Sequence, residues 1–170
     1  FWDGGILSNT PLETVFEENP RRKSLVFEVQ LWNPDGPPPQ SLFDVATRTK
    51  DIQYSSRSAV AVEREKKTHR LRHIIRELAD RLPVEERMDP RVRMLAGYGC
   101  EATMHVVRLL APSVAHEDYA KDIDFSAEGI AARWAAGLAD TRAVLAAAPW
   151  AVEMDRMEGV IVHEARGGEM

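Results

Sequence analysis

The sequence contains only one cysteine, Cys100, among its 170 residues. A single thiol excludes an internal disulfide framework and any multi-thiolate zinc site within the chain. An excess of basic residues is also missing, since the formal net charge is -5. Nucleic acid and acidic membranes usually attract basic proteins, so this composition supplies no overall field for them. We therefore expect no nucleic-acid partner and a plain buried thiol at Cys100.

Long apolar runs are lacking as well. No stretch approaches the ~20 apolar residues needed to span a bilayer, and the first residues lack the basic region and apolar run of a signal peptide. These features favour a cytoplasmic protein, with peripheral contact at a membrane left open. The chain opens at Phe1 without an initiator methionine, which predicts that it is a piece of a longer product.

What is present is the composition of a folded domain. Hydrophobic residues make up 44% and charged residues 29% of the chain, a balance typical of globular proteins and unlike that of disordered segments. A chain of this length is able to bury a sizeable core. We therefore expect one domain, or a domain with an appended piece.

The first 33 residues predict a short helix and a strand. Thr10 is a suitable N-cap, Pro11 suits the first helical position, and Glu13 would complete a capping box for a helix from about Pro11 to Glu18. From Ser24 to Trp32, apolar residues alternate with residues of which some are apolar and some polar. Both faces are therefore partly apolar, which predicts a strand in a sheet that is covered on both faces. Three consecutive prolines then make residues 34–40 the clearest internal boundary.

After this boundary Ser41 is a suitable cap for a long helical region that runs, with interruptions, to about Arg81. Its second half carries one apolar stripe at helical spacing: Leu71, Ile74, Ile75, Leu78 and Leu82. Met104 to Leu110 is predicted to be a strand, and its charged members suggest a less buried position.

A second long helix is expected from Ser126, its cap, to about Ala148. Its expected packing face is formed by four large side chains at helical spacing: Ile130, Trp134, Leu138 and Leu145. Val160 to Val162 is predicted to be a last short strand, and residues 166–170 a frayed tail.

The most specific local feature is Asp3-Gly4-Gly5, followed by Asn9, Pro11 and Leu12. Two glycines after an aspartate let the backbone turn tightly while the carboxylate points into a cleft. An Asp-Gly-Gly step alone is most often only a turn. The wider pattern, Trp-Asp-Gly-Gly-x-x-x-Asn-x-Pro-Leu, resembles the second signature of patatin-like phospholipases.

This resemblance implies a serine lipid acyl hydrolase with a Ser-Asp dyad. Asp3 would be the general base that activates the serine, Gly4 and Gly5 would shape its loop, and Asn9 would help to fix the exit into the next helix. Such a dyad needs no metal and no other cofactor. The implied substrate is an acyl lipid or ester, and the implied setting is lipid degradation in a bacterium.

The likeness extends beyond the motif. Lys50 to Arg57, the helix ending at Pro83, and Lys121 to Ser126 resemble a bacterial patatin subgroup with an extra C-terminal domain of unknown function. The implied fold is α/β: residues 1–33 end a patatin-type three-layer α/β/α hydrolase domain, 34–40 connect, and 41–165 form a mainly helical extension with one or two strands.

The serine itself is missing. No G-x-S-x-G occurs in the sequence, and Ser55, Ser56 and Ser58 lie in a helical pattern without glycine. We therefore expect the isolated chain to be inactive, with the serine supplied by a missing N-terminal part of the same protein. Two other hypotheses remain open: a non-catalytic helical module for assembly, oligomerisation or lipid access, and a catalytically dead relative.

Histidines offer weaker candidates. His69 and His73 are four residues apart, but no third ligand completes a metal pattern, so a solvated helix face is favoured. His105 and His163 lie in strand-like stretches and are expected to be structural. The basic residues between Lys66 and Arg76 could meet lipid headgroups, although helix-surface pairs such as Glu63 with Lys67 are favoured.

Overall fold

The computed structural model describes residues 11–18, 21–33, 35–36, 38–111, 123–155 and 157–164, and for residues 56–59 it describes the backbone only. Within these ranges no helix combines the length and the apolar character that crossing a membrane requires. The predicted cap Thr10 and the predicted site residues Asp3, Gly4, Gly5 and Asn9 lie outside the described residues.

Helix α1 (Leu12–Phe16) and strand β1 (Ser24–Gln30) form the first part of the described chain. Both were predicted, and both are shorter than the sequence pattern indicated. Leu12 and Phe16 lie one helical turn apart, and both are buried because they share one face of α1. In β1 the side chains alternate between a buried face and an exposed one.

Helix α2 (Leu42–Arg81) is one uninterrupted helix of 40 residues, so the expected interruptions are absent. The predicted cap is confirmed, because the Ser41 hydroxyl accepts a hydrogen bond of 3.1 Å from the Asp44 amide. The Asp44 carboxylate accepts in turn from the Gln40 amide at 2.9 Å. The helix stops just before Pro83, whose ring disfavours a helical conformation at the preceding residue.

Two short helices, α3 (Val84–Arg87) and α4 (Pro90–Ala96), follow α2 and were not predicted. The start of α4 is well defined, because Asp89 Oδ1 accepts hydrogen bonds from the amides of Arg91 and Val92 at 2.7 and 3.2 Å. The chain then enters strand β2 (Met104–Leu110), whose predicted bounds are confirmed.

Helix α5 (Ala127–Ala147) begins at its predicted cap, since the Ser126 hydroxyl accepts from the Gly129 amide at 3.1 Å. It ends at Ala148, which adopts a left-handed conformation (φ 40°) and leads into the 3-10 helix η2 (Pro149–Ala151). Strand β3 (Val160–Glu164) confirms the last predicted strand.

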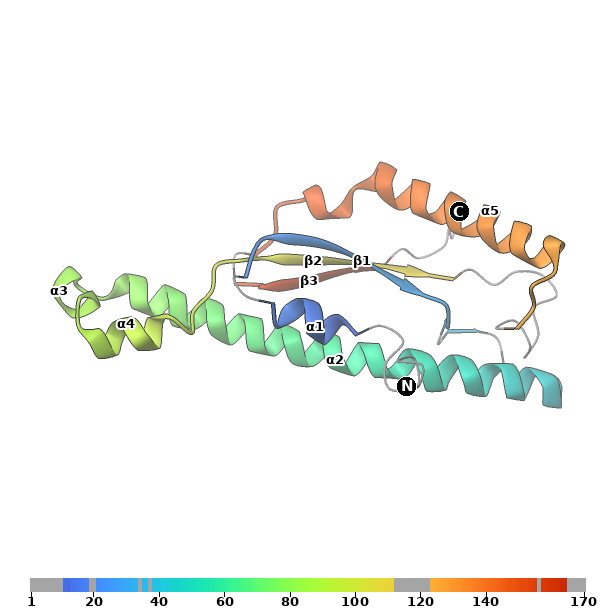
Figure 1. Ribbon diagram of the computed structural model, residues 1–170, viewed down its shortest axis with the longest axis horizontal. Helices are drawn as coiled ribbons and strands as arrows, with labels where there is room; N and C mark the ends of the chain where they lie inside the picture. Colours follow the sequence, from blue (N-terminus) through green and yellow to red (C-terminus); the bar gives the residue numbers. More distant parts are fainter. Residues whose placement is uncertain are drawn as a thin grey trace.

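The three strands form a parallel sheet in the order β1-β2-β3. Parallel neighbours need long crossovers, which α2 to α4 provide between β1 and β2, and α5 between β2 and β3. Figure 1 shows the sheet between α5 on one side and α1 with α2 on the other. The predicted α/β class is confirmed at this level. The sheet joins strands from both sides of residues 34–40. The domain boundary expected at these residues stays a prediction.

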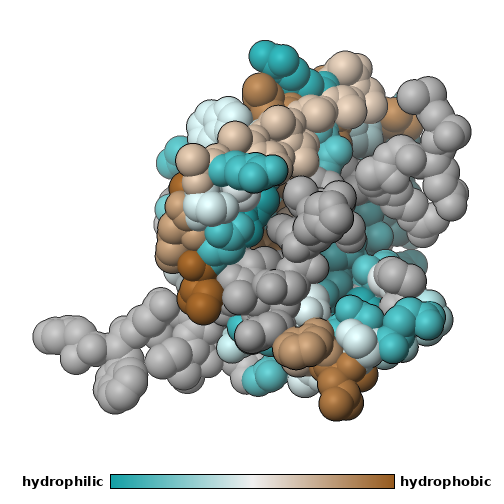
Figure 2. Space-filling view, turned by 90° about the vertical axis from the view of Figure 1, so that its right-hand side faces the viewer, coloured by the Kyte–Doolittle hydropathy of each residue, from teal (hydrophilic) through white to brown (hydrophobic). Residues whose placement is uncertain are grey.

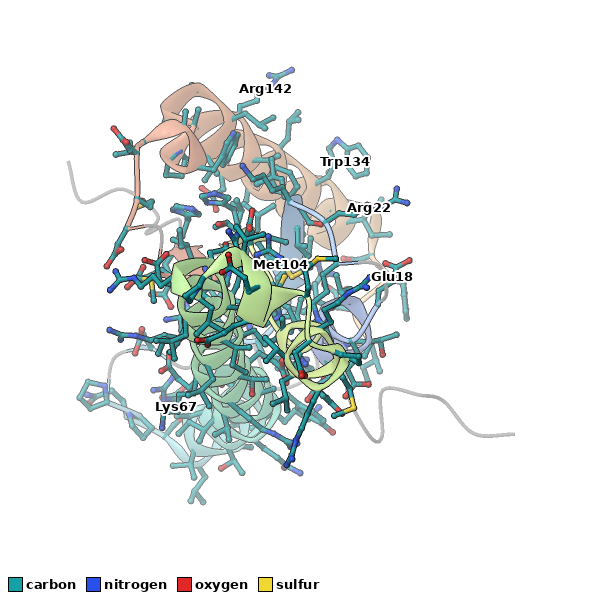
Figure 3. The ribbon with its side chains drawn as sticks, turned by 90° about the vertical axis from the view of Figure 1, so that its left-hand side faces the viewer. Glu18, Arg22, Lys67, Met104, Trp134 and Arg142 are labelled. Atoms are coloured by element: carbon teal, nitrogen blue, oxygen red, sulfur yellow. The ribbon has the colours of Figure 1, made fainter. Side chains whose placement is uncertain are left out.

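The hydrophobic core lies between the sheet and the two helices α1 and α2. Its buried members come from four elements, α1, α2, β2 and β3: Leu12, Phe16, Val62, Met104, Val106 and Val160. Figure 3 shows Met104 in the interior, while Trp134 and Arg142 project outward from α5. Strand β2 supplies the centre of this core, so the expectation that it is less buried was wrong: the middle strand of a sheet is covered by both neighbours.

The predicted packing face of α5 was also wrong, and the apolar stripe on α2 is partly uncovered. The stripe along the second half of α2 does not face the sheet, and Leu71 and Leu78 are 61% and 59% exposed. In α5, Trp134 is 75% exposed, and among the described residues of the helix only Val144 is buried. Helical spacing shows which residues share a face, but the tertiary structure decides which face is covered.

Candidate functional site

A ladder of charged side chains crosses the sheet on the side that faces α1 and α2. The register places Glu28, Arg108 and Glu164 side by side on the three strands. Arg108 Nε donates to Glu28 Oε2 at 3.1 Å, and Arg108 Nη1 donates to Glu164 Oε1 at 3.0 Å. The side chain of Glu28 is 1% exposed and that of Arg108 is 10% exposed, so this contact is a buried ion pair. We call these three residues the charge ladder.

The surroundings of the charge ladder satisfy most of its polar groups. Gln30 Nε2 donates to the other oxygen of Glu28 at 2.6 Å. Arg108 Nη2 is buried, and no residue in the described ranges accepts a hydrogen bond from it. An isolated charge is costly to bury, and mutual pairing with hydrogen bonds reduces this cost. The charge ladder therefore ties β1, β2 and β3 together near their carboxyl ends, where α/β proteins commonly place functional groups.

The charge ladder was missed from the sequence, although its members gave a signal. Each is a charged residue inside a predicted or actual strand, and Arg108 was one reason to expect a less buried β2. A charged residue in a strand indicates exposure unless a partner lies opposite it. Only the register, which sequence alone did not supply, brings Glu28 and Glu164 to the two sides of Arg108.

A second polar cluster lies on the side of α2 that faces the sheet. His69 is fully buried and His73 is 6% exposed, so the predicted solvated face was wrong. Burial, followed by the nearby Arg72 guanidinium, lowers the pKa of His69 to about 4. The Phe16 ring lies against His69 in an edge-on arrangement at 6.1 Å between centroids. His69 is therefore a neutral core residue at pH 7.

The chain just before β3 lies close to both histidines, and this contact explains why they are buried. A Cβ atom added at Gly159 would lie 2.7 Å from His69 Cβ and 3.1 Å from His73 Nε2. The His73 ring is fixed from another direction, because its Nε2 lies 3.1 Å from the Ala102 carbonyl oxygen and forms a hydrogen bond with it. Both histidines thus serve packing between α2 and the loops that lead into β2 and β3.

Two further histidines, His105 and His163, form a pair on the opposite side of the sheet, toward α5. His105 Nδ1 and His163 Nε2 are 2.9 Å apart, and the two rings are stacked. Burial lowers the pKa of both rings, and the charge of His105 lowers that of His163 further. One ring donates and the other accepts, so the hydrogen bond requires at least one unprotonated nitrogen. This contact agrees with the structural role expected for both residues.

His105 also lines a hollow of about 510 Å³ at the amino ends of the strands. Its other polar lining includes Lys23, Glu101 and Asp155, with Trp150 forming part of the wall. Glu101 is engaged by Arg76 at 2.7 Å, and Asp155 accepts from the Met157 amide at 2.9 Å. Because its charges are of both signs and partly engaged, the hollow does not define one class of ligand.

The other sequence candidates have plain roles. Cys100 is a buried free thiol, as predicted. Two of the basic residues between Lys66 and Arg76 form helix-surface pairs: Lys66 bonds to Glu63 at 2.9 Å, in place of the expected Glu63 with Lys67, and Arg76 bonds to Asp80 at 3.1 Å. In the described ranges no group of three or more His, Cys, Asp or Glu side chains could hold a metal ion.

The fold and its polar clusters define an α/β protein with a parallel sheet and a buried charge ladder. A family model described as patatin phospholipase matches residues 52–157, which is more than half of the chain. The chain therefore belongs to the patatin phospholipase family. Neither the curated proteins nor the solved structures gave a match.

The family match and the Asp3 motif lie in different parts of the chain. The matched range runs from within α2 to the turn after η2 and includes β2 and α5. The motif lies at residues 2–12 and does not overlap with it. Two separate segments therefore indicate the same family, and at the level of the family the match supports a hydrolase of lipid esters.

Proposed function

We propose that this chain is the aspartate-bearing part of a serine lipid acyl hydrolase. Asp3 acts as the general base of a Ser-Asp dyad, Gly4 and Gly5 shape its loop, and Asn9 holds the loop that leads into α1. The observation that carries the proposal is the presence, on one chain, of the Asp-Gly-Gly motif and of an independent match to the patatin phospholipase family.

The chemistry is ordinary nucleophilic catalysis. The Asp3 carboxylate accepts the hydroxyl proton as the serine oxygen attacks the carbonyl carbon of the ester. The acyl-serine forms, and the alcohol leaves with the proton. Water then attacks the acyl-serine by the same route, which releases the fatty acid and restores both side chains. No cofactor enters these steps.

The serine belongs to another segment of the same protein in this proposal, because no G-x-S-x-G occurs among the 170 residues. We accordingly expect the 170-residue chain to show no ester hydrolysis by itself. The charge ladder supports a connecting role for β1. This strand follows the Asp3 segment, and Arg108, inside the family-matched range, binds it through Glu28. We also propose that the complete hydrolase domain has a patatin-type three-layer α/β/α fold.

The decisive experiment is Asp3→Asn in the protein that carries both this chain and the proposed serine. Loss of a general base lowers the turnover of a simple ester by about 100-fold or more. Asp35→Asn is the matched control, because Asp35 is an exposed loop carboxylate. Circular dichroism should show that both variants fold. Turnover in Asp3→Asn similar to that of the control would overturn the assigned role.

A second candidate function rests on a different observation. The end of α2, with α3 and α4, leaves many large apolar side chains exposed, which suits a surface for assembly or lipid access more than a catalytic site. The two functions are compatible in one protein. A third reading, a relative that has lost the serine, predicts no hydrolysis by the complete protein and is tested by the same assay.

A further inference from the structure

The most unusual surface of the molecule is an arm formed by residues 71–98. It contains the last turns of α2 together with α3 and α4, and Figure 1 shows it extending beyond the end of the sheet. Helix α4 packs against α2, so the arm is a folded helical hairpin. The apolar stripe that the sequence revealed on α2 belongs to it.

The arm exposes large apolar side chains along its whole length. Seven of them are more than half exposed: Leu71, Leu78, Val84, Met88, Met94, Leu95 and Tyr98. Scattered exposed apolar residues are normal on soluble proteins, but a concentration of them on one projecting element indicates an interaction surface.

Each short helix of the arm combines its apolar residues with arginine, one in α3 and two in α4. In α4, Arg91, Met94 and Leu95 follow i, i+3, i+4 spacing and so share one side, away from the partly buried Val92 and Ala96. Tyr98 follows in the turn after α4 and is exposed as well.

In α3 and the turn after it, Val84, Arg87 and Met88 share one side by the same spacing. Glu85 and Glu86 fall on the other side. Both arginine-bearing sides are therefore free of acidic residues.

The arginines of the two short helices are also not neutralised. Among the described residues, Arg87, Arg91 and Arg93 form no ion pair, whereas Arg76 and Arg81 on α2 are bonded to Asp80 and Glu77. Leucine, methionine and tyrosine beside unpaired arginines suit the boundary of a lipid layer, where apolar parts enter the acyl region and guanidinium groups meet phosphates.

We propose that the arm docks the protein onto a lipid surface that carries anionic phosphate headgroups. Met94, Leu95 and Tyr98 enter the boundary region, and Arg91 contacts the phosphates. This inference rests on the proposed function, since a hydrolase of lipid esters acts where its substrate is assembled. A second copy of the chain is the competing occupant, and the test below separates the two.

The test measures cosedimentation of the 170-residue chain with vesicles of phosphatidylglycerol and phosphatidylcholine, and with vesicles of phosphatidylcholine alone. We expect binding to the mixed vesicles and weaker binding to the neutral ones. The double substitution Met94→Asp with Leu95→Asp should reduce binding about tenfold or more, since two apolar contacts are lost. Arg91→Gln should reduce mainly the preference for anionic vesicles.

The matched control is Leu42→Asp. Leu42 is 86% exposed at the other end of α2, and Figure 2, which looks onto that end, shows apolar surface there. Asp44 lies beside it and gives that site no positive charge. An aspartate in the first turn of a helix is also well tolerated, so this variant should fold and bind vesicles like the unchanged chain.

The proposal is overturned if the unchanged chain does not bind anionic vesicles, or if the double variant binds as well as Leu42→Asp does. It is also overturned in favour of a second copy if the double substitution instead dissociates a dimer, as measured by light scattering. Hydrolysis of a soluble ester by the complete protein, with and without Asp3→Asn, tests the proposed function separately, because that assay needs no vesicle.

Discussion

The two sides of helix α2 contrast sharply. The side beneath the sheet buries polar residues, including Glu65, His69 and His73, and among the side chains that the structure describes Val62 is the single large aliphatic residue buried with them. The other side exposes Leu71 and Leu78. Position relative to the sheet, and not side-chain polarity, decides which residues of α2 are covered. The buried side thus serves folding, and the exposed apolar side belongs to the arm that we propose as a docking surface.

The largest expected effect lies in the charge ladder, on the face of the sheet that the covered side of α2 meets. Arg108→Met keeps the volume of the side chain but leaves Glu28 buried without its cation, so we expect the free energy of unfolding to fall by about 3–5 kcal/mol. Urea titration followed by circular dichroism measures this change.

The matched control is Arg81→Met, because Arg81 forms an exposed pair with Glu77. Its loss should change stability by about 0.5 kcal/mol or less. Equal effects of the two substitutions would show that the charge ladder does not hold the strands together.

A smaller effect is expected at the contact between Gly159 and the two buried histidines. Gly159→Ala places a methyl group 2.7 Å from His69 Cβ, and such overpacking should destabilise the fold by about 1–3 kcal/mol. Gly137→Ala is the control, because an added Cβ there meets nothing within 4 Å. Inside α5 it should stabilise by roughly 0.5–1 kcal/mol. The same sign for both substitutions would contradict the close contact.

His69, on the covered side of α2, makes the stability of the fold sensitive to pH. Its pKa in the folded protein is lowered to about 4 from 6.5, so the unfolded chain takes up the proton first. Stability is therefore full at neutral pH and is lost as the pH falls from about 6.5 toward 4. From pH 7 to 5 we expect a loss of about 2 kcal/mol from this residue. His69→Gln should flatten that part of the pH profile, and an unchanged profile would rule out the neutral, buried ring.

The smallest effect is expected on the exposed side. Leu78→Gln removes a side chain that is 59% exposed, so stability should change by only about 0.5 kcal/mol. Val62→Ala, on the covered side of the same helix, should cost about 2 kcal/mol. Differential scanning calorimetry of the two variants compares the sides directly. If Leu78→Gln proved as costly as Val62→Ala, the contrast between them would disappear.

The sequence predicted what local interactions determine. Ser41 and Ser126 were identified as helix caps because a cap depends on residues within one turn. The bounds of β2 were predicted because Ala111 and Pro112 interrupt the strand pattern. The bounds of α2 followed from Ser41 and Pro83 in the same way.

Long-range relations were not predictable in this way. The burial of His69 depends on Gly159, and the pairing of Arg108 depends on the register of three strands. Both relations join residues far apart in the chain. Asp3 was found by a third route, resemblance to a family signature, and its geometry lies outside the described residues.

The central claim is that Asp3 activates a serine supplied by the same protein. The most direct measurement is covalent labelling of the complete protein by a fluorophosphonate, which reacts with activated serines. We predict labelling at a single serine, with a rate that falls by about 100-fold or more in Asp3→Asn. Labelling at an unchanged rate in Asp3→Asn, or no labelled serine in the unchanged protein, would contradict the claim.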